Sequence, residues 1–305
     1  MRLKMFNKDN TVKHIGKGFT KNKTLGHLRD VEKYYVKKAI KLKMDYEYDV
    51  TADELPYFKT FAYTEHAHCF LGTTLCNDNR RQSIEEAHAD DAEIKIDYLG
   101  YLKEKVNNST SNKYSHADGK KPLPPRDHLI VPVGSNKIKT DMDINKCKFI
   151  ISQVGEENVY FKPHPITSNE LIGAIKDQLE GDLDLGIVTG RYEDLYGLLK
   201  NAKVVHTSHR SESCVYAVAL GKEIDPIDVY KTIPRASYYH INKPLFESED
   251  PYNYMQKVFN SPKCGIFNPE LETEWQKKMD MWFEYQMDKR QFYSCAYVYN
   301  KEGTI

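Results

Sequence analysis

The clearest pattern of hydrophobic and polar positions lies between residues 128 and 227. Short apolar runs recur there, and amphipathic stretches with near-helical spacing separate them. Strands that alternate with helices of this length are typical of a parallel sheet covered by helices on both faces. The pattern therefore predicts a doubly wound α/β domain. The expected strands are 128–133, 158–161, 185–189, 203–207 and 223–227, and the expected helices are 143–154, 169–180, 192–201 and 212–220.

The first half of the chain has a less regular pattern. Apolar residues at 12–15, a glycine turn and helical spacing over 25–40 predict a strand, a tight turn and a helix. A further strand is expected at 58–63, and helical spacing returns within 82–105. The opening stretch therefore forms a βα unit.

Two stretches mark the domain boundaries. Residues 107–125 are rich in Asn, Ser, Lys, Gly and Pro and lack hydrophobic periodicity, which is typical of a linker. Residues 270–292 place large apolar side chains mostly on one helical face, which predicts a helix that packs back on the rest of the protein. We therefore expect an N-terminal domain over 1–125, a second domain over 126–270 and this helical segment over 271–305.

Composition places the chain among globular proteins. It has 305 residues, 40% of them hydrophobic and 29% charged, and a mean hydropathy of −0.67. Its longest apolar runs, such as 129–133, are far shorter than the roughly 20 residues that cross a membrane. The N-terminus lacks the apolar stretch of a secretory signal, and the six cysteines have no short paired spacing. We therefore expect a cytoplasmic protein with reduced thiols and no membrane span.

Charge is unevenly distributed, although the formal net charge is zero. The first 43 residues hold 13 Lys or Arg and three acidic residues, which leaves 31 basic and 41 acidic residues for the rest. Such asymmetry points to a surface near the N-terminus that faces a polyanion. A solvated, lysine-rich helix face is the alternative explanation.

The first candidate site follows the strand expected at 158–161. Lys162, Pro163, His164 and Pro165 stand between this strand and the next helix. The carboxyl ends of parallel strands are where α/β folds bind ligands, and the two prolines fix the backbone around the imidazole. A histidine and a lysine beside a helix N-terminus suit a phosphate group. The simpler alternative is a loop whose prolines merely end the strand.

A second loop with similar chemistry ends the strand expected at 203–207. Hydroxyl groups and free backbone N–H groups before a helix form an anion site, and a histidine and an arginine add positive charge. Two such loops on one edge of a sheet predict a nucleotide site. The candidate residues in this loop are Ser208, His209, Arg210, Ser211 and Ser213.

Three short motifs resemble those of a known family. Residues 162–165 (Lys-Pro-His-Pro) resemble its His-Pro motif, residues 211–213 (Ser-Glu-Ser) its serine motif two strands later, and Asp90-Asp91 its acidic loop. On these residues the chain resembles glycosyltransferases of the B fold (GT-B), in particular bacterial sialyl-, polysialyl- and Kdo-transferases and enzymes of capsule polysaccharide. The resemblance implies two Rossmann-like, doubly wound α/β domains that face a cleft.

The resemblance also implies roles for individual residues. His164 and the serine motif would hold the nucleotide and phosphate of a sugar donor, and Asp91, or else Asp90, would act as the general base on the acceptor hydroxyl. Two positions depart from the family pattern, because Ala92 stands where the family has glycine and Tyr216 where capsule enzymes often have glutamate. No metal is expected, and no cofactor beyond the nucleotide sugar, which is itself a substrate.

The acceptor is expected to be a hydroxyl group in DNA. The excess of basic charge lies in the domain that would hold the acceptor, where lysines can contact phosphates. We therefore expect a sugar transferase of the kind that large bacterial viruses use on hydroxylated or hydroxymethylated cytosine, acting in the cytoplasm of the bacterial host. A capsule or lipopolysaccharide glycan is the alternative acceptor. The candidate acceptor-binding residues are Lys17, Lys21, Lys23, Glu65 and His66.

Two other functions remain open. His66 with His68, and His88 with the Asp90-Asp91 pair, are metal-capable side chains that would suit a metal-dependent hydrolase. The basic N-terminus alone would suit a nucleic-acid-binding module without catalysis. Neither alternative predicts that the protein binds nucleotide sugars.

Overall fold

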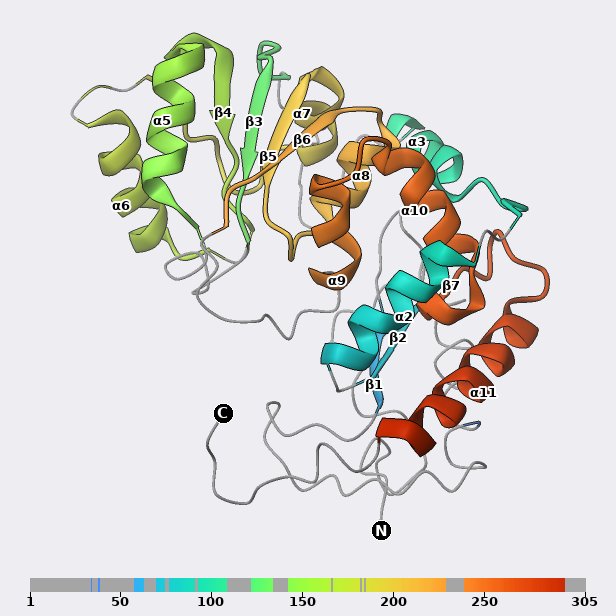
Figure 1. The fold of residues 1–305 in the computed structure, drawn as a ribbon. Coiled ribbons are helices and arrows are strands. Elements are labelled where there is room, and N and C mark those ends of the chain that lie inside the picture. The colour runs from blue at the N-terminus through green and yellow to red at the C-terminus, as the bar shows by residue number, and fades with distance from the viewer. Residues whose placement is uncertain are drawn as a thin grey trace, which may run out of the picture. The chain divides into compact units, whose positions relative to one another are not determined.

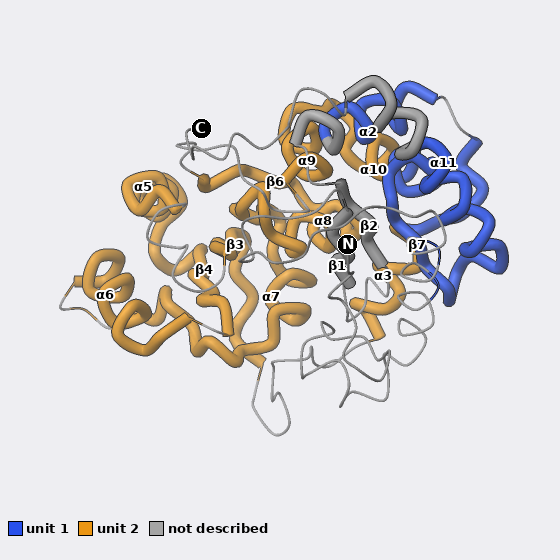
Figure 2. Tube along the Cα trace, turned by 90° about the horizontal axis from the view of Figure 1, so that it is seen from below, with its two compact units in different colours: residues 1–98, 256–305 blue, residues 99–255 orange. Residues whose placement is uncertain are grey.

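The computed structural model divides into two compact units (Figure 2). Unit 1 consists of Met1–Tyr98 together with Gln256–Ile305, and unit 2 of Leu99–Met255. The domain boundaries expected at 125 and 270 refer to domains that fold independently. The division into compact units does not test them, so they stay a prediction. The residues that the structure describes are 34, 38, 58–62, 70–74, 77–90, 93–108, 122–133, 142–165, 167–181, 183, 185–228 and 239–293.

Unit 2 is built on a parallel sheet. Its strands are β3 (His128–Val131), β4 (Val159–Phe161), β5 (Val204–Thr207) and β6 (Glu223–Pro226), in the spatial order β4-β3-β5-β6. These strands confirm four of the five predicted from the sequence. The fifth, expected at 185–189, is reduced to an isolated parallel bridge between Phe161 and Val188. Gly186 has a φ of 63°, which lies outside the extended region, so a regular strand cannot run through this position.

The helices predicted for unit 2 are confirmed as well (Figure 1). They are α5 (Ile144–Val154), α6 (Asn169–Glu180), α7 (Leu195–Asn201) and α8 (Ser213–Ala219). Side chains cap three of them: Asp143 accepts from Asn145 N, Ser168 from Leu171 N and Asp194 from Tyr196 N. Each cap satisfies backbone N–H groups that have no partner inside the helix, so the sequence itself fixes where these helices begin.

Both faces of this sheet carry buried side chains. One face packs against α5 and α6, and the side chains buried there include Ile130, Cys147, Ile150, Phe161 and Ile175. Successive side chains of a strand point to opposite faces, so the buried Leu129 and Val131 point to the other one. Unit 2 is therefore an α/β layer structure, as the alternation of strands and helices predicted.

The order of the strands reverses between β3 and β5. From β3 the chain moves to β4 and then to the bridge at Val188, and it returns to the other side of β3 to form β5 and β6. Open α/β sheets bind ligands outside the carboxyl ends of their strands at such a switch point. The ends of β3 and β5 therefore mark where a ligand site is expected.

The remaining elements of unit 2 are short, apart from two helices that reach its boundary with unit 1. α3 (Tyr98–Asn108) begins at the last residue of the first segment of unit 1, and α10 (Pro251–Asn260) runs from unit 2 into unit 1. Between these helices in the chain lie η3 (Glu156–Asn158), α9 (Tyr239–Asn242) and η4 (Lys243–Phe246).

Unit 1 has a different sheet. Its described strands, β1 (Phe58–Ala62), β2 (Phe70–Thr74) and β7 (Ile266–Phe267), pair antiparallel in the order β1-β2-β7. Its helical segments are α2 (Asn77–Ala89), η5 (Pro262–Cys264) and α11 (Trp275–Tyr293). The parallel arrangement is thus shown for unit 2, and the second Rossmann-like domain stays a proposal. The βα unit expected at 12–40 lies outside the described residues, except that Tyr34 and Lys38 are helical.

The predicted C-terminal helix is confirmed as α11. Met279, Trp282 and Phe283 lie on one side of it and are fully buried, and the rings of Trp282 and Phe267 meet edge to face with their centroids 6.1 Å apart. None of the helices that the structure describes is long and apolar enough to cross a membrane.

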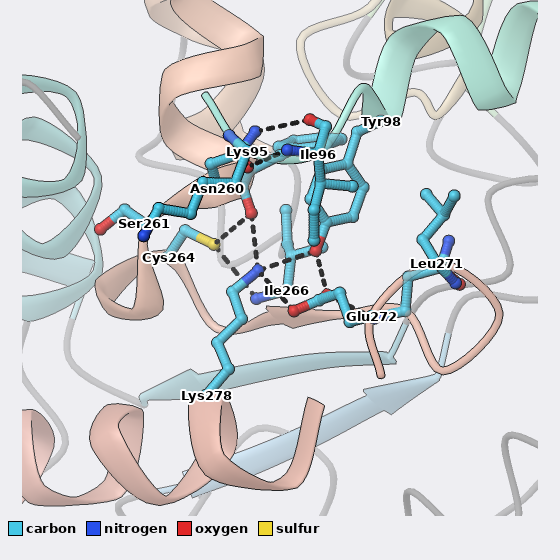
Figure 3. A network of polar contacts seen from close by, with 12 residues as sticks. Lys95, Ile96, Tyr98, Asn260, Ser261, Cys264, Ile266, Leu271, Glu272 and Lys278 are labelled. Carbon is cyan, nitrogen blue, oxygen red and sulfur yellow. Dashed lines mark hydrogen bonds and ion pairs between the residues drawn. The ribbon is translucent and has the colours of Figure 1, made fainter. Parts of the chain in front are cut away.

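A buried polar network joins three segments of unit 1 (Figure 3). Lys278 Nζ contacts Tyr98 Oη at 2.8 Å, Phe259 O at 2.7 Å and Glu272 Oε2 at 3.2 Å. Tyr98 donates its hydroxyl hydrogen to Glu272, which also accepts from the backbone N of Asn268 at 2.8 Å. An ion pair buried this well needs its remaining polar atoms satisfied, and this network satisfies them.

Candidate functional site

Every donor-binding residue predicted from the sequence lies in unit 2, at the carboxyl edge of the parallel sheet. The loop after β4 carries Lys162 and His164, and the loop after β5 leads from Ser208 to Ser213, the first residue of α8. Because the strands are parallel, both loops leave the sheet at the same edge. The structure thus brings the two predicted loops to the edge where the strand order reverses.

The loop after β4 is tied to the loop that follows Val188. The ammonium group of Lys162 donates to Pro163 O at 2.9 Å and to Arg191 O at 2.8 Å, and Arg191 donates to Thr167 O at 3.0 Å. Burial lowers the pKa of Lys162 to about 8, and the nearby carboxylates of Glu193 and Asp194 offset this only in part. In this geometry Lys162 holds two loops together, and a contact to a ligand phosphate stays a prediction.

His164 lies at the turn of the same loop. Its backbone carbonyl accepts from Thr167 N at 2.9 Å, and its side chain is half-buried, between two prolines that restrict the backbone. Thr167 is fully buried, and its hydroxyl oxygen has no partner among the described residues. The loop therefore presents an imidazole on a backbone that is fixed on both sides.

The loop after β5 contains a chain of three hydroxyl groups. Ser211 Oγ lies 2.6 Å from Ser213 Oγ, which lies 2.7 Å from Thr207 Oγ1, and Thr207 donates to Val131 O at 3.0 Å. The same loop uses its backbone N–H groups internally: Arg210 N and Ser213 N donate to serine hydroxyls, and Ser211 N donates to Ser208 O. Thr207 thus joins the ends of β3 and β5 directly at the switch point.

Asp228 anchors the start of this loop and was missed in the sequence analysis. A single carboxylate oxygen, Oδ2, accepts from Ser208 Oγ at 2.9 Å, from His209 N at 2.6 Å and from His209 Nδ1 at 3.0 Å. The side chain of Asp228 is 9% exposed, and His209 is buried against Phe246, with ring centroids 4.4 Å apart. The buried imidazole therefore supports the loop. The signal that the sequence offers for Asp228 is its position just after β6.

Asn242 fixes the same loop from α9. Its amide group donates to His209 O at 3.0 Å and to Ser211 O at 2.8 Å, and its side-chain oxygen is buried without a partner among the described residues. Glu212, which follows Ser211 in the loop, accepts a hydrogen bond of 2.6 Å from the hydroxyl of Tyr216. Tyr216 is one of the two positions that depart from the family pattern. No local sequence pattern pointed to Asn242, because the contact depends on how α9 packs.

A row of titratable groups crosses one face of the sheet. Lys146 Nζ lies 2.8 Å from Asp225, Asp225 lies 2.9 Å from His206 Nδ1, and His206 Nε2 lies 3.1 Å from His128 Nδ1. Although burial by itself raises it, hydrogen bonds from His206 and Lys146 leave the pKa of Asp225 below its usual value. Burial, and then the nearby His206, lower the pKa of His128. The row stabilises Asp225 as a carboxylate within the sheet.

Of the predicted general bases, Asp90 is described and Asp91 is not. Asp90 follows the last residue of α2, where it forms an ion pair with Lys263 and accepts from Ser261 Oγ at 3.3 Å. This pairing occupies the Asp90 carboxylate within unit 1. Asp91 and Ala92 lie outside the described residues, so the role of Asp91 stays a prediction.

The predicted acceptor-binding residues also lie outside the described part of the chain, namely Lys17, Lys21, Lys23, Glu65 and His66. Two other members of the basic segment contact α11: Lys38 forms an ion pair with Asp280 at 2.8 Å, and the hydroxyl of Tyr34 donates to the same carboxylate at 3.0 Å. The ring of Tyr34 also meets Trp275 edge to face, with centroids 5.4 Å apart. Tyr34 and Lys38 therefore pack against α11 within unit 1.

Among the described residues, no three His, Cys, Asp or Glu side chains are grouped so that they could hold the ion of a metal-dependent hydrolase. His66 and His68 lie outside them. Cys147, Cys214 and Cys264 are buried free thiols. Burial raises the pKa of Cys147 to about 12 and raises that of Cys214 as well, so these two thiols are structural.

Comparisons with known proteins add no relative. No family model matches the chain, and neither the curated proteins nor the solved structures give a significant match. The features that bear on function are therefore the carboxyl edge of the unit 2 sheet and the motifs that lie there.

Proposed function

We propose that the protein is a glycosyltransferase that transfers a sugar from a nucleotide-sugar donor to a hydroxyl group. One observation carries the proposal: the loops after β4 and β5, which hold the His-Pro and serine motifs, both leave the sheet at its carboxyl edge, beside the point where the strand order reverses. Nucleotides bind α/β sheets at such a place. Both motifs lie at this edge of the sheet.

The proposed roles follow from the chemistry of sugar transfer. The departing nucleotide phosphate needs positive charge, which His164 and Arg210 can supply, and the acceptor hydroxyl needs a base that takes its proton. We assign the base to Asp91, since Asp90 is occupied by Lys263. In this proposal a second Rossmann-like domain carries the base, as in the GT-B enzymes that the chain resembles.

Calorimetric titration with UDP-, CMP- and GDP-sugars tests the donor assignment. The wild-type protein is expected to bind one of the three classes, and His164→Ala is expected to weaken that binding by about tenfold or more, because a hydrogen bond to a charged group contributes about 1.5–3 kcal/mol.

His88→Ala is the matched control for this titration. His88 is an exposed histidine near the end of α2 in unit 1, so its removal is expected to leave donor affinity unchanged. The proposal is wrong if none of the three classes binds the wild-type protein, and the assignment of His164 is wrong if both variants bind alike.

We further propose DNA as the acceptor, held by the basic N-terminal segment. The support is the charge distribution, with 13 basic and three acidic residues among the first 43. Changing Lys17, Lys21 and Lys23 to Glu is expected to weaken duplex DNA binding for all sequences. It is also expected to lower the slope of log affinity against log salt by roughly one for each phosphate that the protein no longer neutralises.

Donor binding in unit 2 provides the internal control for this charge reversal, since it is expected to be unaffected. If the wild-type protein does not bind duplex DNA at about 50 mM salt, where phosphate contacts are strong, a capsule or lipopolysaccharide glycan becomes the preferred acceptor.

A further inference from the structure

The direction of every hydrogen bond in the hydroxyl chain after β5 is fixed by its inner end. Val131 O is a carbonyl and can only accept, so Thr207 must donate to it. Thr207 Oγ1 then accepts from Ser213, and Ser213 Oγ in turn accepts from Ser211. All three hydroxyl hydrogens therefore point inward, away from Ser211 and toward β3.

Ser211 is the outer end of this chain. Its Oγ donates its hydrogen to Ser213 Oγ and accepts a hydrogen bond of 3.2 Å from the backbone N–H of Ser213. A hydroxyl oxygen has two lone pairs, and the contacts among the described residues use one of them. Thr207 and Ser213 are buried, whereas Ser211 is half-exposed, so the available lone pair is at the accessible end. The row of three hydroxyl groups therefore offers a hydrogen-bond acceptor to a ligand.

The neighbouring backbone groups lead to the same conclusion. His209 N donates to Asp228, Arg210 N to Ser208 Oγ and Ser211 N to Ser208 O. Phosphate oxygens at neutral pH are acceptors, and they gain little from a group whose hydrogen is already used. A ribose hydroxyl can donate to Ser211 Oγ and still accept from another group.

We propose that Ser211 accepts a hydrogen bond from a ribose hydroxyl of the bound nucleotide and does not bind its phosphates. In this role Ser211 is a specificity-determining residue. This inference rests on the proposed function, and it assigns the nucleoside end of the donor to the loop after β5. The phosphates then belong to the other groups at this edge, such as His164. The expected signature is a preference for ribose over dideoxyribose that depends on a single oxygen atom.

Calorimetry with UDP, CMP and GDP and with their 2′,3′-dideoxy forms tests the proposal on the full chain. For the nucleotide that binds the wild-type protein, the ribose form is expected to bind about fivefold more tightly than the dideoxy form, as one neutral hydrogen bond allows. Ser211→Ala is expected to remove this difference by weakening the ribose form alone. Ser211→Thr keeps the oxygen and is expected to retain the preference.

Two results would overturn the assignment while leaving the proposed function in place. One is equal weakening of the ribose and dideoxy forms in Ser211→Ala, which would mean that Ser211 does not recognise the ribose hydroxyl. The other is weaker binding of inorganic pyrophosphate in that variant, which would mean that Ser211 contacts phosphate. Ser152→Ala, on the exposed side of α5, controls for the loss of a serine elsewhere in unit 2. If no nucleotide binds the wild-type protein, the proposed function and this inference fail together.

Discussion

Lys278→Met is expected to lower the free energy of unfolding by about 3–5 kcal/mol, because it removes one partner of a buried ion pair. The Lys278 side chain is 11% exposed and that of Glu272 is 5% exposed. Without the ammonium group, the Glu272 carboxylate stays buried with Tyr98 and the backbone of Asn268 as its only donors among the described residues, and Phe259 O loses a donor (Figure 3). Methionine keeps the length of the side chain, so the lost charge dominates the effect.

Tryptophan fluorescence during urea unfolding measures this loss in unit 1. The chain has two tryptophans, Trp275 and Trp282, and both belong to α11. Lys277→Met is the control on the same helix, since Lys277 is 69% exposed and is expected to change stability by less than about 1 kcal/mol. Combining Lys278→Met with Glu272→Gln removes the unpaired charge and is expected to recover much of the stability. A single variant as stable as the control would contradict the structural role of the network.

Asp228→Ala is expected to destabilise unit 2 by about 2–4 kcal/mol and to loosen the loop after β5. The substitution leaves three donors without their acceptor: the Ser208 hydroxyl, the backbone N–H of His209 and its imidazole Nδ1–H. Each buried donor left without a partner costs about 1–3 kcal/mol, and the costs overlap because the loop can partly relax. Nucleotide binding should weaken with it, since this loop is the proposed nucleoside site.

Hydrogen exchange locates the effect of the Asp228 substitution within the chain. The amides of His209 and Arg210 are expected to exchange faster in Asp228→Ala, whereas Asp228→Asn keeps an acceptor oxygen and is expected to restore most of the protection. Asp127→Ala is the matched control, because its half-exposed carboxylate pairs with the exposed Lys203 and contributes about 1 kcal/mol or less. Unchanged exchange at His209 in Asp228→Ala would show that the carboxylate does not hold the loop.

The architecture of unit 2 could be predicted from the sequence because its elements are specified locally. Apolar runs such as 128–131 alternate with helices whose caps, Asp143, Ser168 and Asp194, are adjacent in the chain to what they cap. The one strand that was overestimated, at 185–189, contains Gly186, whose positive φ the hydrophobic pattern does not reveal.

The candidate site was predictable in position and only partly in chemistry. The motifs at His164 and Ser211 follow strands, so topology alone brings them to one edge of the sheet. The sequence could not show that Lys162 donates to Arg191 O, a carbonyl 29 positions away, or that His209 is buried against Phe246 and Asp228. Which of the predicted residues in these loops contact a ligand therefore depends on partners that the sequence does not show.

The sequence by itself determined the alternating strands and helices of unit 2, the C-terminal helix and the placement of two polar loops, since these depend on periodicity, caps and chain order. Only the tertiary structure decided which polar atoms remain for a ligand, because hydrogen bonds pair groups from distant parts of the chain. Asp228 reaches back 19 positions to His209, Asn242 reaches back 31 to Ser211, and Tyr98 meets Glu272 across 174. Such pairs satisfy buried donors and acceptors, and no local pattern records them.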